Sequence, residues 1–459
     1  MSVRWSLCID FGTAFSKAAV VPADSWRRFD ASTVRPLMLS PDDGGNPFLL
    51  DSAVFVDEDR VLFGYPAIER GEALASRKRA ALRSFKTLLS VSDLDRVLNT
   101  NAPPAVDPHR VFPLRDLVVL YLAYLLASVE RGIAADPALA AGSFERRYAA
   151  PAWRSGDSAG LHQTVVRLFG EAEAFRREVG EDLLSPEGLS FAYINEHLPG
   201  ALDAPAHLPM GLIFEATAAA ACSIIGTEDA ASYVMVVDMG AGTTDITAMA
   251  NTKGRIQELA DARVTLKEAG DHIDRIIANM IIEESHEARS MIQQTQLWRA
   301  LMPRMRDIKE SLFLDGRATV RGERRAITVM MRDLERNDDF KRFHKSLKEA
   351  YDHSFAVMRD YAARNKGRDV HAVAVGGGAS APFIQALLTA KQPRASNLRI
   401  EARPATPDWA HAPEFEGNLA PVFPQLAIAV GGALAPAPML AAQANPDASG
   451  QTGTRAARD

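Results

Sequence analysis

The stretch YVMVVDMGAGTTDITAM, Tyr233 to Met249, decides the fold of this chain. An apolar run reaches Asp238, turns through GAG, and continues into a second strand-like run that opens with Thr243. A short continuous apolar block before a glycine-rich turn is typical of a strand buried on both faces. The turn brings backbone N–H groups close to an anion, and Thr243 adds a hydroxyl. Asp238 and Asp245 cannot bind phosphate directly, so a bound nucleotide would need Mg²⁺ and its waters between them.

A second copy of this pattern lies at the start of the chain. The stretch WSLCIDFGTAFSKAAVV, Trp5 to Val21, again has an apolar strand, an acid at Asp10, then Gly12, Thr13 and a second strand. Two hairpins with an acid at the same place indicate a duplicated fold. We therefore expect two phosphate-binding loops that face each other across a cleft.

Composition limits the class of protein. The chain has 459 residues, enough for two to four domains, and its 47% hydrophobic content supports sizeable cores. The 52 basic and 58 acidic residues give a net charge of −6, which argues against nucleic acid as the main partner. Cys8 and Cys222 are flanked by small or apolar residues, which indicates two buried thiols in a reducing compartment, and no Cys/His group has zinc spacing.

Targeting and membrane signals are weak. The N-terminus lacks a basic region followed by an apolar signal core. The most apolar helix candidate, Leu117 to Ala127, is about half of the ~20 residues that a bilayer span needs. We expect a cytoplasmic protein that is not bound to a membrane.

Three further signals lie outside the two hairpins. Lys86 sits among apolar residues, so its stem is expected to be anchored while its charged head points at a specific target. Glu215 ends a short strand and opens an alanine-rich helix; it is a candidate functional carboxylate or, alternatively, an acid favoured by the helix dipole. A third glycine turn, Gly376 to Ser380, follows the strand Val370 to Val375 and leads into a helix from Pro382.

Other elements are expected from periodicity. The pattern predicts a strand at Ser52 to Val56, a helix at Leu301 to Leu314 with Pro303 in its first turn, and an apolar helix at Val422 to Leu434. The Ala-, Pro- and Gly-rich residues 436–459 are expected to be disordered.

Four motifs, in this order, resemble those of the actin-like ATPase superfamily. They are the first phosphate loop IDFGTAFSK, the connecting helix FEATAAAA, the second phosphate loop VVDMGAGTTD and the adenosine loop VGGGASAPFI. Within the superfamily, the segments FGYPAIERG, SFKTLL, YAAPAW, EAGDHID and MRDIKESL are most similar to the nucleotide-binding domain of the heat-shock protein 70 chaperones. The likeness covers roughly residues 3–436.

The resemblance implies an α/β, ribonuclease H-like duplicated fold with two lobes around a nucleotide cleft. Lobe I is expected at 1–228, with a small β-containing subdomain at about 35–115, and lobe II at 229–420, with a helical and β subdomain at about 265–340. A C-terminal helix at 421–436 would return to lobe I, and residues 437–459 would form a disordered tail.

The resemblance also implies site roles. Asp10 and Asp238 would hold the water shell of Mg²⁺, Lys86 would stabilise the transferring phosphoryl group, and Glu215 and Asp245 would position water or metal. The groups expected to bind ATP or ADP are Gly12, Thr13, Ala14, Lys17, Gly240, Ala241, Gly242 and Thr243 at the phosphates, and Gly376, Gly377, Gly378, Lys309 and Arg306 at the adenosine. This chemistry is mostly positioning and charge neutralisation.

The chain departs from the chaperone pattern near the phosphates. Lys17 stands where actin-type members carry a phosphate-binding lysine, whereas the chaperones rely on the later one, here Lys86. Both candidates are present. Ala241 replaces the middle glycine of the usual triple-glycine turn, which is harmless only if its φ is negative.

Other departures affect adenosine recognition and signalling. Arg306 and Glu310 stand where the family has an acid and a base, respectively. Pro151 matches a proline that relays nucleotide state between domains, but Ala159 lies near the place of the arginine expected after it. The chain ends where a linker and peptide-binding domain would begin, so we infer no peptide-clamping activity.

The leading hypothesis is a chaperone-like ATPase that hydrolyses ATP slowly and signals its nucleotide state to a separate protein partner, with neither nucleic acid nor membrane involved. One alternative is a filament-forming or scaffold ATPase of the actin or cell-division type. Others are a small-molecule kinase of the same superfamily, which needs an acceptor pocket and a base, and a nucleotide-binding protein without turnover.

Overall fold

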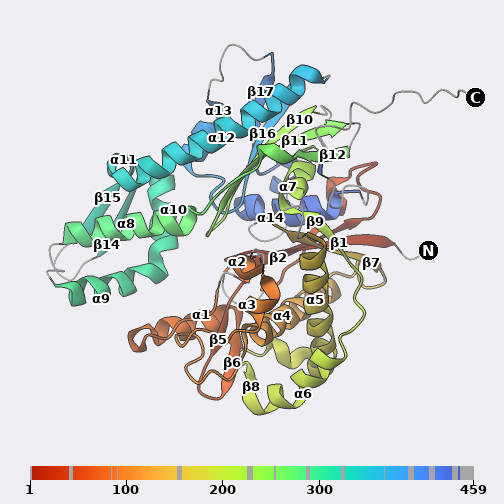
Figure 1. Ribbon diagram of the computed structural model, residues 1–459, viewed down its shortest axis with the longest axis vertical. Coiled ribbons are helices and arrows are strands. Elements are labelled where there is room, and N and C mark those ends of the chain that lie inside the picture. The colour runs from red at the N-terminus through yellow and green to blue at the C-terminus, as the bar shows by residue number, and fades with distance from the viewer. Residues whose placement is uncertain are drawn as a thin grey trace, which may run out of the picture.

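Figure 1 shows the computed structural model of the chain. The described residues are 3–40, 45–83, 85–89, 91, 93–151, 158–224, 231–252, 255–285, 290–321, 326–365, 367–390, 397–412, 419–436 and 443–444. Within them, two large mixed sheets lie one above the other, and each carries a group of helices and a small sheet at one end.

The first sheet forms the core of the N-terminal half. Its strand order is β3 (Arg35–Pro36), β2 (Phe15–Pro22), β1 (Arg4–Phe11), β7 (Ser143–Ala150) and β9 (Met210–Phe214), and β4 (Leu50–Asp51) also pairs with β2. β1 runs antiparallel to β2 and parallel to β7. The acid of the first hairpin therefore lies at the C-terminal edge of the parallel strands.

The second sheet repeats this arrangement. Its order is β12 (Arg255–Leu259), β11 (Thr244–Thr252), β10 (Tyr233–Met239), β16 (Asp369–Val375) and β17 (Arg399–Arg403), with β13 (Val264–Leu266) on β11 and β18 (Gln443–Ala444) on β12. β10 is antiparallel to β11 and parallel to β16. Each sheet thus has a hairpin followed by two parallel strands.

The register of the two hairpins is the same. Asp10 pairs with Lys17 across the first hairpin, and Asp238 pairs with Asp245 across the second. The paired positions are seven residues apart in both hairpins, with six residues between them. The duplicated fold expected from the two sequence copies is confirmed at the level of individual strand pairs.

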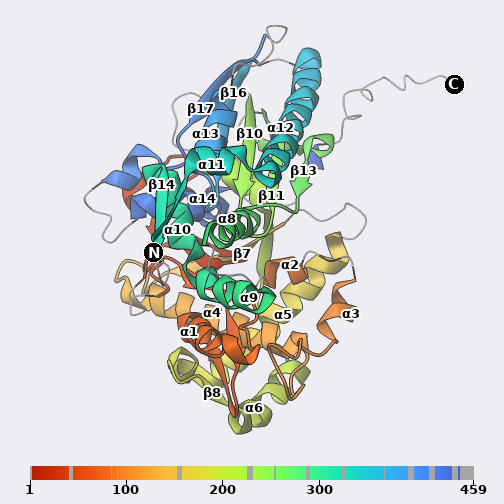
Figure 2. The ribbon, with the colours of Figure 1, turned by 90° about the vertical axis from the view of Figure 1, so that its left-hand side faces the viewer.

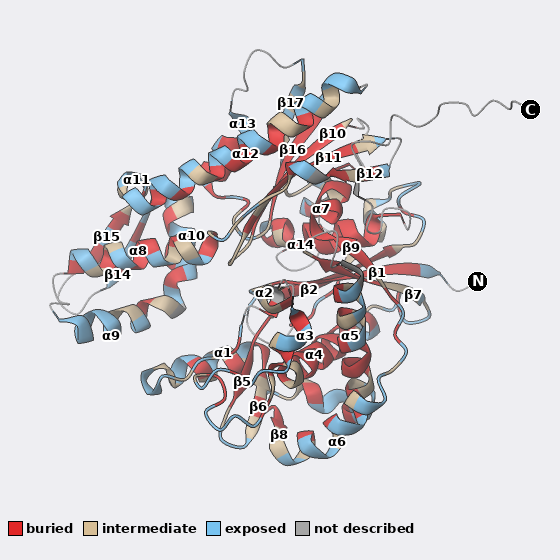
Figure 3. Cartoon of the chain, viewed as in Figure 1, coloured by how far each residue is buried: buried red, intermediate tan, exposed pale blue. Residues whose placement is uncertain are grey.

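Two apolar helices lie between the sheets (Figure 3), namely α7 (Glu215–Ile224) and α14 (Leu419–Leu434). They pack closely because small residues face each other. A Cβ added at Gly431 would overlap the carbonyl oxygen of Ala218, and one at Gly432 would overlap the sulfur of Cys8 in β1. The main chain of α14 therefore lies directly against α7 and β1.

The N-terminal half continues into a helical group with a small sheet. It contains α1 (Gly64–Ala73), α2 (Phe85–Leu89), α3 (Leu94–Leu98), α4 (Leu114–Ala135), α5 (Ser158–Val179), α6 (Phe191–Asp203), β5 (Val54–Val56), β6 (Arg60–Phe63) and β8 (Leu189–Ser190). α4 is longer than the apolar segment expected from the sequence, and it has the length and apolar composition of a membrane span. However, 83% of its most apolar window is buried inside the protein. This burial is typical of a core helix.

The second group of helices extends from the second sheet (Figure 2). It contains α8 (Gly270–Ser285), α9 (Met291–Leu301), α10 (Met305–Asp315), α11 (Met331–Arg336), α12 (Asp338–Arg364), β14 (Arg317–Arg321) and β15 (Ala326–Met330), while α13 (Pro382–Thr389) follows β16. Short 3₁₀ turns lie at Ala31–Thr33, Ala75–Arg77, Gly180–Leu184, Ala260–Ala262, Met302–Arg304 and Asp408–His411.

Several expected boundaries were wrong. The helix predicted from Leu301 is divided: α9 ends at Leu301, a 3₁₀ turn contains Pro303, and α10 starts at Met305, because proline lacks the N–H that a continuous helix needs. The strand predicted from Ser52 starts at Val54. Of the tail predicted to be disordered, Gln443 and Ala444 form a short strand, and the rest lies outside the described residues.

Candidate functional site

The first hairpin places Asp10 beside Lys17. The Nζ atom of Lys17 lies 2.6 Å from Oδ2 of Asp10, and both side chains are almost completely buried. Gly12 is required here, because an added Cβ would overlap the Phe15 carbonyl oxygen and lie 2.9 Å from Lys17 Nζ. Ala14, at the tip of the loop, accepts a backbone hydrogen bond from Ser52 (2.9 Å). The loop is thus fixed to the neighbouring segment and carries a compact ion pair.

The second loop is supported by the start of α8. Its own turn is closed by the Gly240 N–H, which donates to the Thr243 carbonyl (3.0 Å). The N–H groups of Gly270 and Asp271 donate to the carbonyls of Gly240 (3.1 Å) and Ala241 (2.8 Å). The φ angle of Ala241 is not positive, so alanine fits at the position where the family uses glycine.

Asp245 is held by two hydroxyl groups. Thr243 Oγ1 donates to its Oδ2 (3.2 Å), and Thr265 Oγ1 donates to its Oδ1 (2.5 Å). Asp245 lies where Lys17 lies in the first hairpin, so the two loops present opposite charges at equivalent positions. The Thr243 hydroxyl, predicted to bind phosphate, contacts a carboxylate in this structure.

The third glycine turn packs against the second loop. Gly376 has a φ of +83°, and an added Cβ would lie 2.6 Å from the Met239 carbonyl oxygen and 2.7 Å from Oδ1 of Asp238. The N–H of Gly376 donates to the Pro424 carbonyl of α14 (2.8 Å), and that of Gly378 donates to the Met239 carbonyl (2.9 Å). A Cβ added at Gly377 would make only an ordinary contact, 4.0 Å from the Gln425 side chain. This turn joins α14 to the end of β10.

Glu215 lies between the two hairpins at the junction of β9 and α7, and it is buried. Its charge acts on groups of both sheets. Burial raises the pKa of Cys8 in β1 well above its ordinary range, and the charges of Asp10 and Glu215 add to this increase, while Arg147 opposes it.

In the second half of the protein, burial lowers the pKa of Arg263, but the Glu258 carboxylate raises it by more. The charges of Asp245 and Glu215 raise this pKa further. The charge of Glu215 thus acts on Cys8 together with that of Asp10, and on Arg263 together with that of Asp245.

The lysine predicted to be catalytic lies on α2. The neighbouring Phe85 is fully buried, with its ring 5.8 Å from that of Phe11 and 4.8 Å from that of Tyr121. Phe11 follows Asp10 directly, so α2 is anchored beside the first loop. The side chain of Lys86 lies outside the described part of the structure, as does the side chain of Ala159, which follows Pro151 along the chain.

The residues predicted to contact adenosine have other partners. Lys309 Nζ lies 2.8 Å from Asp274 Oδ1 and donates to the Gly270 carbonyl (3.3 Å). Arg306 pairs with Glu310 (3.0 Å), and its guanidinium carbon lies 4.7 Å from the centroid of the Phe15 ring in the first hairpin. Arg306 thus connects α10 with the first loop.

A magnesium–nucleotide complex fits this donor set. Asp10 Oδ1 is buried and accepts no hydrogen bond from the described residues. A metal-bound water is a suitable donor for such an oxygen. The described residues contain no group of three or more His, Cys, Asp or Glu side chains suited to holding a metal directly.

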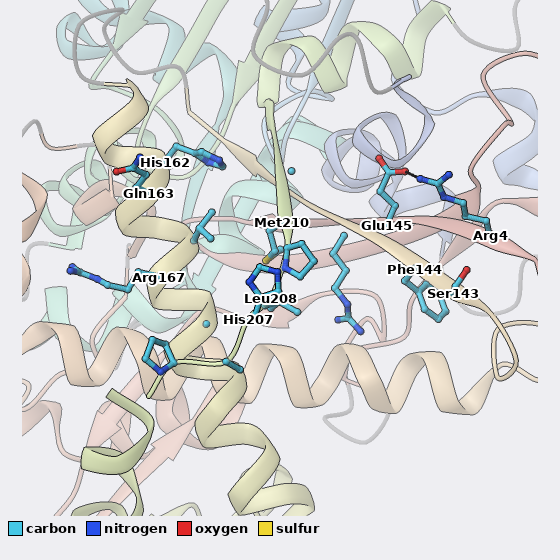
Figure 4. A pocket seen from close by; sticks show the side chains of 17 residues that line it. Arg4, Ser143, Phe144, Glu145, His162, Gln163, Arg167, His207, Leu208 and Met210 are labelled. Carbon is cyan, nitrogen blue, oxygen red and sulfur yellow. Dashed lines mark hydrogen bonds and ion pairs between the residues drawn. The ribbon is translucent and has the colours of Figure 1, made fainter. Parts of the chain in front are cut away.

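A cavity of about 940 Å³ lies away from these loops (Figure 4). Its lining includes the starts of β1, β7 and β9 and the α5 residues His162, Gln163 and Arg167, and the Arg4–Glu145 ion pair (2.9 Å) lies at one side. Asp10 and Glu215 lie at the opposite, C-terminal edge of the same parallel strands. This cavity is therefore separate from the predicted nucleotide site.

Sequence reasoning missed a residue that connects the site to α14. Arg147 in β7 is buried, and its Nη1 donates to the carbonyls of Gly432 (3.0 Å) and Ala435 at the C-terminal end of α14. The available signal was that Arg147 directly precedes the apolar run Tyr148 to Ala150, because a buried charge needs a partner.

Two similar sheets, each with an acid at the same place in its first hairpin and with two helices between them, define an actin-like ATPase fold. Residues 209–401 match the family model described as Hsp70 protein. This part of the chain is therefore similar to Hsp70 proteins, as the motifs within it predicted. The match includes Glu215, the second loop and the third glycine turn, whereas Asp10 and Lys17 lie outside it. None of the curated proteins compared with the chain matches it.

Proposed function

We propose that this protein is a magnesium-dependent ATP switch that hydrolyses ATP slowly and signals its nucleotide state to a partner protein in the cytoplasm. The observation that carries the proposal is the equal register of the two hairpins, with Asp10 and Asp238 at matching positions and Glu215 buried at the start of α7, which lies between the two sheets. Two loops of this kind can hold a chain of phosphates from both sides.

Each group would contribute position or charge. Asp10 and Asp238 would hold the water shell of Mg²⁺, which when bound neutralises phosphate charge. The backbone N–H groups of Thr13 and Ala14 would donate to phosphate oxygens. Glu215, which is buried, would orient the attacking water and accept its proton.

The lysines would stabilise negative charge during transfer. Lys17 is already held at the first loop by Asp10, and α2, the helix that contains Lys86, is anchored beside the same loop through the buried Phe85. Removing one charge contact to the transition state typically lowers the rate by ~10²- to 10³-fold. The base and ribose would lie against Gly376 to Gly378, with Lys309 on the side of α10.

The proposal includes slow turnover and readout by a separate partner protein. The readout is supported by the small-residue contact of α14 with α7 and β1, because α14 also accepts a hydrogen bond from the Gly376 turn. A change at the nucleotide can therefore alter how the two sheets are arranged. A partner protein that contacts both sheets would detect the difference.

The test is calorimetric titration with Mg·ATP, followed by single-turnover hydrolysis. Asp238→Asn should weaken binding or turnover at least tenfold, and Lys86→Ala should reduce hydrolysis far more than binding. Asp203→Asn, an exposed acid of α6, is the matched control. Unchanged binding and hydrolysis in Asp238→Asn would show that the second loop does not hold the phosphates.

The partner can be sought by pull-down with matched ADP- and ATP-loaded protein. A filament-forming ATPase is the second candidate, and the Asp10–Lys17 ion pair favours it, because the lysine occupies the place used by actin-type members. Light scattering that rises with protein concentration and ATP would support the filament. A monomer at all concentrations would exclude it.

A further inference from the structure

α10 reaches across to the first phosphate loop. Its buried side chains Met305, Ile308 and Leu312 belong to the apolar core of the second half of the protein. Phe15, by contrast, opens β2 and packs on the core between the sheets. The Arg306 guanidinium lies over the Phe15 ring, 4.7 Å from its centroid. This contact joins two separately packed parts of the chain.

The same helix is attached to the second phosphate loop. One turn after Arg306, Lys309 contacts Asp274 (2.8 Å) and the carbonyl of Gly270 at the start of α8. The N–H of Gly270 in turn donates to the Gly240 carbonyl in the second loop (3.1 Å). A continuous set of contacts therefore runs from Phe15 through α10 and α8 to Gly240.

We propose that the Arg306–Phe15 contact is a latch that holds the two phosphate loops together and slows nucleotide release. The proposal rests on the proposed function, in which the nucleotide lies between these loops. Release then requires the loops to separate, and the latch must break for α10 to move away from β2. Glu310 pairs with Arg306 one turn along α10 and fixes the orientation of the guanidinium (3.0 Å).

The latch is a different role from the adenosine contact expected from the sequence. In the structure one face of the guanidinium covers Phe15. If the latch controls release, removing either partner has the same effect, and removing both adds nothing. If Arg306 instead contacts the base, its removal and that of Phe15 act independently, and their effects multiply.

The first experiment measures dissociation of a fluorescent ADP analogue by stopped flow. An exposed cation–aromatic contact of this kind is worth about a two- to fivefold change in rate. Arg306→Gln and Phe15→Leu should each raise the dissociation rate by that factor, and the double variant should match the larger single effect. Arg306→Lys, which keeps the cation, should stay closer to the unaltered protein.

Arg299→Gln is the matched control, since it removes an exposed charge from α9 in the same helical group. Its dissociation rate should equal that of the unaltered protein. A rate unchanged by Arg306→Gln would overturn the latch, and so would a double variant whose effect equals the product of the single effects.

The second experiment needs no nucleotide. α1 and α9 lie opposite each other at one side of the molecule in both views (Figures 1 and 2). Cysteines introduced at the exposed Glu69 in α1 and Gln296 in α9 can carry spin labels for distance measurement by pulsed electron resonance. Burial raises the pKa of Cys222 to about 12 and that of Cys8 further, so the native thiols react slowly.

Arg306→Gln should broaden the distance distribution toward longer values relative to the unaltered protein. An identical distribution would overturn the latch. If the unaltered protein binds no nucleotide at all, the proposed function fails, and the distance measurement still decides whether Arg306 and Phe15 hold the two parts together.

Discussion

Lys17 lies directly opposite Asp10 in the first hairpin, with its Nζ atom 2.6 Å from Oδ2 of the carboxylate. In the second hairpin the equivalent position holds Asp245, opposite Asp238. The fold is duplicated, but the charges are not. The first hairpin therefore carries both a cation and an anion at these positions, whereas the second carries two anions, of which Asp245 is held by the hydroxyls of Thr243 and of Thr265 in β13.

Lys17→Met should destabilise the fold. The substitution leaves the buried Asp10 carboxylate without its cation, and breaking one side of a buried pair costs about 3–5 kcal/mol. Urea denaturation followed by circular dichroism measures this loss. Asp10→Asn combined with Lys17→Met removes the buried charge and should recover much of the stability; a single variant as stable as the unaltered protein would contradict the prediction.

Gly376→Ala should weaken both the fold and Mg·ATP binding. Its φ of +83° costs a non-glycine residue about 1–2 kcal/mol, and the new Cβ would press on Asp238 Oδ1. Gly45→Ala is the control, since an added Cβ there meets no atom within 4 Å. Thermal unfolding and calorimetric titration should separate the two variants, and equal behaviour would show that the turn adapts.

Arg147→Met should lower the melting temperature by removing the donor to the last carbonyls of α14. Leaving buried carbonyls unpaired costs about 1–3 kcal/mol. Arg4→Met offers the comparison, because that arginine is mostly exposed and its ion pair with Glu145 contributes little. Differential scanning calorimetry of both variants checks the difference; a larger loss for Arg4→Met would reverse the assignment.

Stability should fall as the pH decreases through the range in which histidine titrates. Burial lowers the pKa of His162, whose ring contacts the Tyr148 hydroxyl (2.7 Å). The unfolded chain then takes up a proton at higher pH than the folded protein, so this contribution is complete above the ordinary pKa of about 6.5 and is lost as pH falls through the lower folded value.

His162→Gln should reduce this dependence. Urea midpoints measured from pH 7.5 to pH 5.5 should decrease less in His162→Gln than in the unaltered protein. His411→Gln, at an exposed histidine, should keep the full decrease. A steeper decrease in His162→Gln would show that the sign is wrong.

The sequence could predict the hairpins because their signals are local. An apolar run, an acid and a glycine turn specify a buried strand and its end, and two copies of that pattern specify the duplication. The strand Val370 to Val375 and the helix from Pro382 were confirmed for the same reason, since proline and glycine restrict the backbone wherever they occur.

Contacts between distant segments could not be predicted in this way. Nothing near Arg306 in the sequence indicates Phe15, and nothing near Arg147 indicates α14, because these pairs form only when the sheets and helices are assembled. The break in the helix at Pro303 was not predicted. Proline is tolerated in the first turn of a helix, but it still ends the helix before it, here α9. The lobe boundaries and the roles of Lys86, Lys309 and Glu215 stay predictions.

The absence of side chains at Gly431 and Gly432 has a mechanical consequence. At Gly431 the main chain of α14 lies against the Ala218 carbonyl of α7, and at Gly432 it lies against the Cys8 side chain of β1. Even a methyl group would push α14 away from α7 at the first position and away from the first sheet at the second. Because α14 lies between the two sheets, this displacement would alter the gap that, in the proposed function, a triphosphate bridges.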